Sequence, residues 1–211
     1  RDPRTALCRG RMLYGAAWTT VYYMKPLLHL SWSCPPLKAL LLRLFGYRGS
    51  LDITLYPDVW MRDLCLLDFG PGTYVANRVT LGTNLVRSDG QIQVAPIRTG
   101  AKVVIGHLAM IGGGSRLGAG TEVGVAAKVG FNARIGARVA IGPEATVDGG
   151  ARIMDDVVIG SRAYIGKGCV IHRGIEIPTG AILPDRTVIR HAFDLQALQV
   201  GPPANGLLRS A

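Results

Sequence analysis

The sequence predicts a parallel β-helix, a solenoid in which short strands stack coil upon coil. Three observations support this fold class: an aliphatic residue recurs at every sixth position, a glycine often follows it, and a small residue often stands four positions after it. We expect the aliphatic side chains to fill the interior and the glycines to permit tight turns between the faces. Helical periodicity is absent from this part of the chain.

The aliphatic column is unbroken from Ile105 to Ile189. In a chain of average composition, fifteen consecutive apolar residues at this spacing have a chance probability of about one in 10⁵. The column consists of Ile105, Ile111, Leu117, Val123, Val129, Ile135, Ile141, Val147, Ile153, Ile159, Ile165, Ile171, Ile177, Leu183 and Ile189. The same phase recurs at Phe69, Val75 and Leu81, so three hexapeptides per coil divide residues 69–194 into seven coils of 18.

Residues 87–99 interrupt the pattern, because Arg87, Gln93 and Thr99 stand where aliphatic residues belong. This stretch forms either an irregular coil or a loop that leaves the solenoid. Loops carried on a rigid scaffold often hold functional residues, so we expect this region to contribute to the functional site.

The first 50 residues are rich in leucine and aromatic residues and predict one or two short amphipathic helices. We interpret them as a cap over the open end of the solenoid. One alternative is a helix lying on a membrane surface, which the net positive charge favours. Another is a transmembrane span over 13–32, which Lys25, Pro26 and His29 disfavour.

The predicted domains are therefore the cap (1–50), an all-β solenoid (51–194) and a C-terminal tail (195–211).

The 24 Lys and Arg residues against 14 Asp and Glu give a net charge of +10, which indicates an anionic partner: nucleic acid, anionic lipid or a polyanionic small ligand. The basic residues are scattered through the repeats without interleaved aromatics, so nucleic acid is not expected. The four cysteines form no CxxC pair, which indicates a reduced, cytoplasmic setting. Cys169 falls in the small-residue column and is expected to pack in the interior.

The repeat [LIV]-G-x-x-[small]-x over residues 69–189 resembles the hexapeptide-repeat acyltransferase superfamily, and the resemblance implies a left-handed β-helix. A narrower resemblance to colanic-acid-type bacterial O-acetyltransferases rests on LLRLFGYRGS (41–50), LYPDVW (55–60), VAPI (94–97) and VGPPANGLLR (200–209). It implies a homotrimer that binds an acyl-CoA co-substrate, with acetyl-CoA as the first candidate, between subunits. It also implies a small-molecule or glycan acceptor, and no metal.

The chain departs from that family at two positions. The family's catalytic histidine lies in a Ser-His-Asp context just before VAPI, whereas NLVRSDG (84–90) keeps Ser88 and Asp89 but contains no histidine. Asn205 stands where the family's closing GxPAK motif has lysine. The family base therefore needs a replacement if this chain catalyses acyl transfer.

His107 is the candidate replacement, because it occupies a coil corner directly after the irregular segment. If 87–99 is a regular coil, Asp89 lies 18 residues earlier and stacks ~4.8 Å away, where its carboxylate can orient the imidazole. His29, His172 and His191 are interpreted as structural or solvent-facing. Asn77, Asn84 and Ser88 are candidates for substrate binding. Arg162, Lys167 and Arg173 are candidates for binding the CoA phosphates.

Three functions remain open. The first is acyl transfer from acyl-CoA to a hydroxyl or amine; the second is a degenerate trimeric scaffold or binding module; the third is a different reaction on a CoA- or carrier-bound substrate. IGHLAMIGGG (105–114) also looks like γ-class carbonic anhydrases, but Gly112 stands at the second zinc-ligand position, so a zinc site is not predicted.

Overall fold

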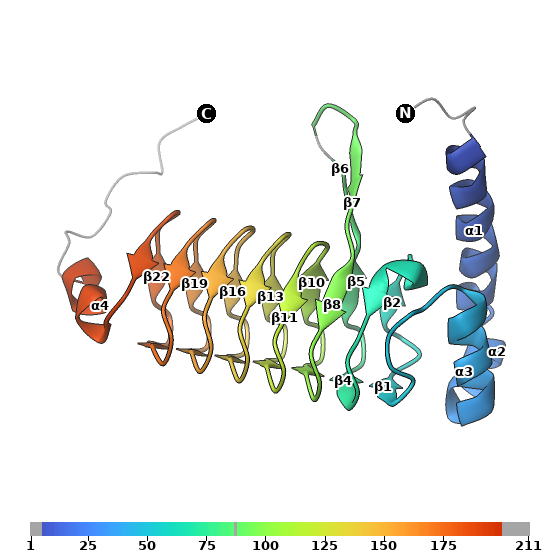
Figure 1. The fold of residues 1–211 in the computed structure, drawn as a ribbon, viewed down its shortest axis with the longest axis horizontal. Coiled ribbons are helices and arrows are strands. Elements are labelled where there is room, and N and C mark those ends of the chain that lie inside the picture. Colours follow the sequence, from blue (N-terminus) through green and yellow to red (C-terminus); the bar gives the residue numbers. More distant parts are fainter. Residues whose placement is uncertain (1–5, 87, 200–211) are drawn as a thin grey trace.

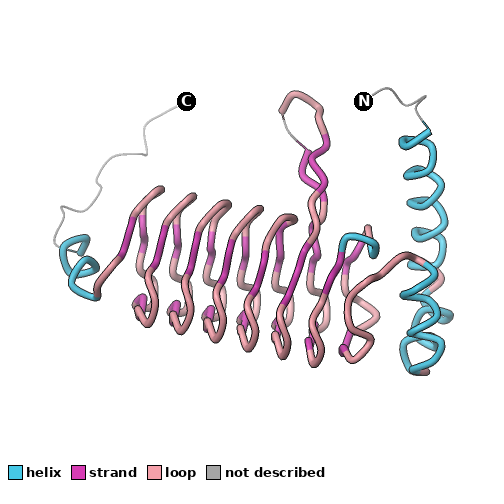
Figure 2. Tube along the Cα trace, in the orientation of Figure 1, coloured by secondary structure: helices cyan, strands magenta, loops and turns pink. Residues whose placement is uncertain are grey.

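The computed structural model describes residues 6–86 and 88–199 and confirms a left-handed parallel β-helix with an N-terminal helical cap (Figure 1). Three parallel sheets of seven strands each form the walls of the solenoid. Neighbouring strands within a sheet come from successive coils, as in the pairing of Val123 with Ile105 on one side and Ile141 on the other. Figure 2 shows these short strands joined by turns along the length of the solenoid.

The strands follow the six-residue period found in the sequence. Sheet 1 contains β1 (Ile53–Leu55), β4 (Thr73–Val75), β9 (Val104–Ile105), β12 (Glu122–Val123), β15 (Ala140–Ile141), β18 (Val158–Ile159) and β21 (Glu176–Ile177). Sheet 2 contains β2 (Trp60–Met61), β5 (Thr80–Gly82), β10 (Met110–Gly112), β13 (Lys128–Val129), β16 (Thr146–Val147), β19 (Tyr164–Ile165) and β22 (Ile182–Leu183). Sheet 3 contains β3 (Leu67–Asp68), β8 (Ile97–Thr99), β11 (Arg116–Leu117), β14 (Arg134–Ile135), β17 (Arg152–Ile153), β20 (Val170–Ile171) and β23 (Val188–Ile189).

We number the coils 1 to 7 from β1–β3 to β21–β23, and we name the turns between faces corner 1–2, corner 2–3 and corner 3–1 after the sheets they join. Coil 1 therefore begins at Ile53, upstream of the predicted start at residue 69. Coil 2 consists of β4, β5 and β8, and coil 3 of β9, β10 and β11.

The aliphatic column forms the interior, where Ile105, Ile111 and Leu117 are at most 2 % exposed. The glycine after each aliphatic residue lies against the next coil: a Cβ on Gly106 would lie 2.7 Å from the carbonyl oxygen of Val123. A side chain there would push the coils apart, so the glycine is required by the coil spacing. Thr99 breaks the column without a penalty, because its hydroxyl lies 3.1 Å from the Thr73 hydroxyl.

Part of the interruption in the repeat forms a β-hairpin, and the rest belongs to the solenoid. β6 (Asn84–Val86) and β7 (Ile92–Val94) pair antiparallel, with Asn84 opposite Val94, and project from corner 2–3 of coil 2 (Figure 1). The chain re-enters the solenoid at β8. Of the two predicted alternatives, the loop that leaves the solenoid is correct.

Three helices cover the first coil, where one or two were predicted: α1 (Ala6–Tyr23), α2 (Lys25–Ser33) and α3 (Pro35–Leu44). Trp18 anchors the cap, because its ring is buried and its indole N–H donates to the carbonyl of Met61 at 2.7 Å. Tyr22 packs edge-on against Trp60, with ring centroids 5.2 Å apart. Among the helices of the described chain, none combines the length and apolarity needed to cross a bilayer.

After β23, helix α4 (Ala192–Gln199) follows the last coil. It occupies the start of the predicted tail. The whole VGPPANGLLR segment (200–209), including Asn205, lies outside the described residues, as does Arg87.

Candidate functional site

His107 and Asn77 lie together at corner 1–2. Val75 pairs with Ile105, so Asn77 of coil 2 falls directly beneath His107 of coil 3. The backbone N–H of Leu108 donates to the Asn77 carbonyl at 3.2 Å, which holds the two turns together. Both side chains are half-buried. The Asn77 Oδ1 atom is buried, and no hydrogen-bond donor reaches it from residues 6–86 or 88–199.

The predicted stacking of Asp89 on His107 is wrong. Asp89 lies in the turn of the hairpin, where it is exposed and its Oδ1 accepts a hydrogen bond from the Gln91 N–H at 2.9 Å. The hairpin adds residues to coil 2, so the residue one coil before His107 is Asn77 and not the residue 18 positions earlier. Asp89 therefore cannot orient the imidazole within its own subunit.

The candidate substrate residues separate into two groups. Asn84 and Ser88 belong to the hairpin at corner 2–3, whereas Asn77 accompanies His107 at corner 1–2. The strand β10 runs from one corner to the other, a distance of ~10 Å for three residues. Within one subunit, His107 and the hairpin thus stand at opposite edges of sheet 2.

The three candidate CoA residues lie at three different corners. Arg162 is at corner 1–2, Lys167 at corner 2–3 and Arg173 at corner 3–1, as the neighbouring strands β18 to β21 show. They do not converge on one phosphate site within a subunit. Arg173 is also engaged in an ion pair, with 2.7 Å between its guanidinium and the Asp156 carboxylate.

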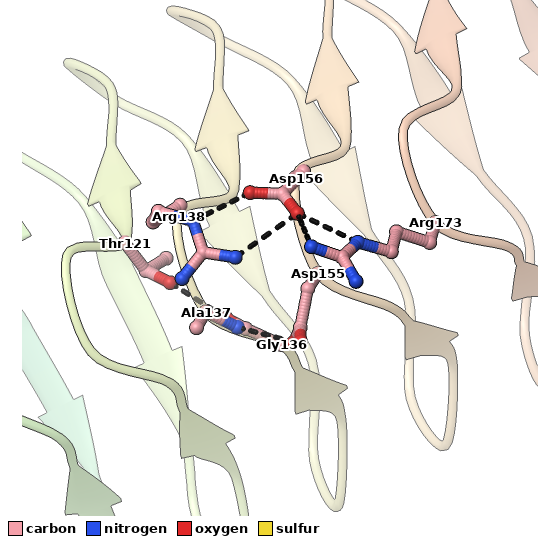
Figure 3. A network of polar contacts seen from close by, with 7 residues as sticks. All are labelled: Thr121, Gly136, Ala137, Arg138, Asp155, Asp156 and Arg173. Carbon is pink, nitrogen blue, oxygen red and sulfur yellow. Dashed lines mark hydrogen bonds and ion pairs between the residues drawn. The ribbon is translucent and has the colours of Figure 1, made fainter.

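Asp156 joins three successive coils at corner 3–1 (Figure 3). Its carboxylate accepts hydrogen bonds from Arg138 at 2.6 and 3.0 Å and from Arg173 at 2.8 Å. These hydrogen bonds lower the pKa of Asp156 to about 2. Asp155 accepts a bond from the Ala137 N–H at 2.8 Å in the same corner. This network binds coil to coil and is structural.

A groove of about 280 Å³ lies on the outer face of sheet 2. It extends over coils 2 to 5, parallel to the solenoid axis, with its edge at corner 2–3 beside the base of the hairpin. The side chains that shape it are those of Thr80, Met110, Lys128, Phe131, Thr146 and Asp148.

One edge of the groove is polar. The Tyr164 hydroxyl donates to Asp148 at 3.2 Å, and desolvation together with this carboxylate raises the pKa of the tyrosine. Lys128 contributes a cation to the groove floor. A long, thin ligand with an apolar body and polar ends fits this arrangement. None of these residues was a sequence candidate, although positions 110, 128, 146 and 164 are spaced by 18 residues.

Two further observations concern chemistry. Cys169 is fully buried, and burial raises the pKa of its thiol, which fits the predicted packing role. Among the described residues, no three His, Cys, Asp or Glu side chains are grouped so that they could hold a metal ion.

Comparison with known proteins supports the repeat and the fold. Residues 126–173, which are 48 of the 211, match the family described as "Bacterial transferase hexapeptide (six repeats)". No curated protein matches the chain significantly. A crystal structure of a hexapeptide transferase family protein from Anaplasma phagocytophilum aligns with a TM-score of 0.52 at 12 % identity, covering 70 % of this chain and 84 % of that one.

A second solved structure is more distant in shape. It is a mutant of GDP-perosamine N-acetyl transferase from Caulobacter crescentus in complex with CoA and GDP-perosamine. It aligns with a TM-score of 0.39 at 22 % identity, covering 63 % of this chain and half of that chain. The first of these alignments, at 12 % identity, shows a similarity of fold.

Proposed function

We propose that this chain transfers an acyl group, with acetyl as the first candidate, from an acyl-CoA thioester to a hydroxyl or amine of a small molecule or glycan. The observation that carries the proposal is the groove on sheet 2, because its length over four coils and its largely apolar floor suit the extended pantetheine arm of CoA. The match of residues 126–173 to a transferase repeat supports the same class.

His107 acts as the general base in this proposal. Its imidazole accepts the proton of the acceptor hydroxyl or amine while the acceptor oxygen or nitrogen attacks the thioester carbonyl. The tetrahedral intermediate then collapses, the C–S bond breaks, and the imidazolium returns the proton to the CoA thiolate. A backbone N–H at a corner stabilises the oxyanion. No acyl-enzyme forms, so the positioning of the two substrates supplies much of the rate.

The site is proposed to lie between subunits of a homotrimer. Within one chain, His107 at corner 1–2 and the groove edge beside the hairpin at corner 2–3 lie on opposite sides of sheet 2, so in this proposal a neighbouring subunit brings its corner 1–2 toward that groove edge. Light scattering is expected to give three times the 22.5 kDa chain mass. A monomer at micromolar concentration would rule out a site shared between subunits.

The cap is proposed to rest on the cytoplasmic face of an anionic membrane. Residues 6–50 contain six basic side chains and no acidic one. The cap also exposes nine large apolar side chains: Met12, Leu13, Tyr23, Met24, Leu27, Leu30, Leu37, Leu40 and Leu44. Exposed apolar groups surrounded by cations are typical of helices that lie in a lipid headgroup layer. Flotation with anionic vesicles, but not with zwitterionic ones, is the expected result.

A scaffold without catalysis is the second candidate, and the hairpin favours it, because residues 84–86 and 88–94 contain no histidine. The two candidates are separated by a thermal-shift screen of CoA thioesters against free nucleotides, followed by an acyl-transfer assay with glycan acceptors. A ligand that binds only the native state raises the melting temperature. Stabilisation by thioesters with turnover supports the transferase, and no response to any thioester supports the scaffold.

A further inference from the structure

Four arginines form a straight row on the outer face of sheet 3. Arg98 pairs in register with Arg116, Arg116 with Arg134, and Arg134 with Arg152. All four are exposed, and they come from coils 2, 3, 4 and 5 in turn. With strands ~4.8 Å apart, the row spans ~14 Å parallel to the solenoid axis. The interpretation that the basic residues are scattered through the repeats is therefore wrong for these four arginines.

The row lacks counter-ions within the subunit. Arg98 lies 3.7 Å from Asp68 at one end. No carboxylate among residues 6–86 and 88–199 lies within ion-pair distance of Arg116, Arg134 or Arg152. Like charges stacked on neighbouring strands repel one another. The fold does not require arginine at these outward positions, since Val170 and Val188 continue the same column. The arrangement thus indicates an anionic ligand.

A second copy of the chain does not supply the missing charges. In an assembly whose symmetry axis runs along the solenoid, coils of equal number face one another. At the levels of coils 2 to 5, the outward residues of sheets 1 and 2 are Tyr74, Val104, Glu122, Ala140, Thr80, Met110, Lys128 and Thr146. Only one of these is a carboxylate, so the row is left for another partner.

We propose that the arginine row binds a linear anionic glycan lying along the solenoid axis. A linear chain fits better than a membrane plane, because Asp148 at corner 2–3 and Asp155 at corner 3–1 flank the row in coil 5 and would repel a flat anionic surface.

Other polyanions fit less well. The outward column of sheet 3 contains no aromatic side chain on which bases could stack. An extended acidic peptide presents side chains on one face only every ~6.6 Å, whereas the strand spacing is ~4.8 Å. A carboxylated glycan carries one carboxylate on each pyranose ring, and rotation about its glycosidic bonds lets these carboxylates turn toward the row.

The row and the groove occupy the same four coils on the two sides of corner 2–3. A glycan bound on the row therefore lies alongside a ligand in the groove, across corner 2–3. This placement names an acidic glycan as the acceptor class, a step that rests on the proposed function. The binding of the glycan does not depend on acyl transfer.

The test measures binding of a fluorescent oligogalacturonate to the full chain without CoA. The double variant Arg116→Gln/Arg134→Gln is expected to weaken binding by about 3- to 30-fold, since each exposed arginine–carboxylate pair contributes modestly. Binding to the native protein should also fall steeply with salt. The matched control is Arg78→Gln/Arg186→Gln, which removes the same charge from exposed corner positions and should bind like the native protein.

Four outcomes would overturn the proposal: native affinity in the Arg116/Arg134 variant, an equal loss in the control, equal binding of the methyl-esterified oligosaccharide, or tighter binding of duplex DNA or anionic vesicles through the same arginines. Circular dichroism of both variants checks that the solenoid is intact. If the glycan binds but is not acylated, the row stands as a binding site and its assignment to the acceptor fails, whereas the thioester screen tests the proposed function separately.

Discussion

His107 stacks on Asn77 of the preceding coil at corner 1–2, and the Asn77 Oδ1 atom is buried without a hydrogen-bond donor among the described residues. A buried acceptor without a partner is costly, and such atoms are often retained where a ligand or a catalytic group completes them. Asn77, and not Asp89, is therefore the residue of the same subunit that stacks on His107.

Replacing His107 tests the proposed base. His107→Ala should lower turnover by about 10²- to 10⁴-fold while acetyl-CoA binding survives, because a general base acts in the transition state. His172→Ala and His191→Ala are the controls and should keep near-native turnover. Near-full activity of His107→Ala on a substrate that the native protein acylates would exclude it as the base.

The hairpin can be removed without loss of the fold. Its strands pair only with each other, so replacing residues 84–94 by a short glycine linker should leave the melting temperature nearly unchanged. Turnover should fall strongly, since the hairpin borders the groove. Asp89→Asn alone should be nearly silent, because Asp89 is exposed in the hairpin turn and does not contact His107 of its own subunit. A collapse of the solenoid after excision would show that the hairpin is structural.

Trp18 is expected to be the main anchor of the cap. Trp18→Ala should reduce the free energy of unfolding by about 3–5 kcal/mol, the range for deleting a buried aromatic side chain. Trp18→Phe keeps most of the packing but leaves the Met61 carbonyl without its donor, which should cost about 1–3 kcal/mol. Urea denaturation followed by circular dichroism measures both. Equal losses for the two variants would contradict the role assigned to packing.

Asp156 should make stability depend on acid. Its pKa of about 2 lies below the ordinary value of 3.8, so its ion pairs stabilise the folded state above pH 3.8, and the contribution is lost as the pH falls toward 2. Asp156→Asn should lower the melting temperature at pH 6 and have little effect at pH 2. Melting curves of both proteins across this range provide the measurement, and a difference that persists at pH 2 would contradict the assignment.

The sequence predicted the solenoid because its signal is local and repeated: each inward aliphatic residue and each glycine such as Gly106 reports the same constraint. The path of 84–94 could not be predicted, since a break in the period does not distinguish an irregular coil from a hairpin. Counting 18 residues back from His107 as if 84–94 were a regular coil leads to Asp89, whereas Asn77 occupies that position in the structure.

Two outward features were predictable from the sequence in principle. Arg98, Arg116, Arg134 and Arg152 are spaced by 18 residues, as are the outward residues of sheet 2, but such polar series do not stand out as the inward aliphatic column does. The separation of Arg162, Lys167 and Arg173 could also be predicted from their spacing. They are five and six residues apart, close to the length of one hexapeptide, so they lie on successive corners.

The central claim is that acyl-CoA occupies the groove on sheet 2, and blocking that groove tests it most directly. Thr146 faces outward in the groove between Lys128 and Tyr164, so Thr146→Trp should fill it. Ala140→Trp is the control, because Ala140 faces outward from sheet 1 in the same coil. Both variants are first shown to keep the native oligomeric state by light scattering.

The measurement is the melting temperature with and without acetyl-CoA. At about 100 times the dissociation constant, a ligand of the native state contributes about 2.7 kcal/mol, a shift of several degrees. The account predicts this shift for the native protein and for Ala140→Trp, and none for Thr146→Trp. A shift retained by Thr146→Trp, or absent from the native protein, would contradict it.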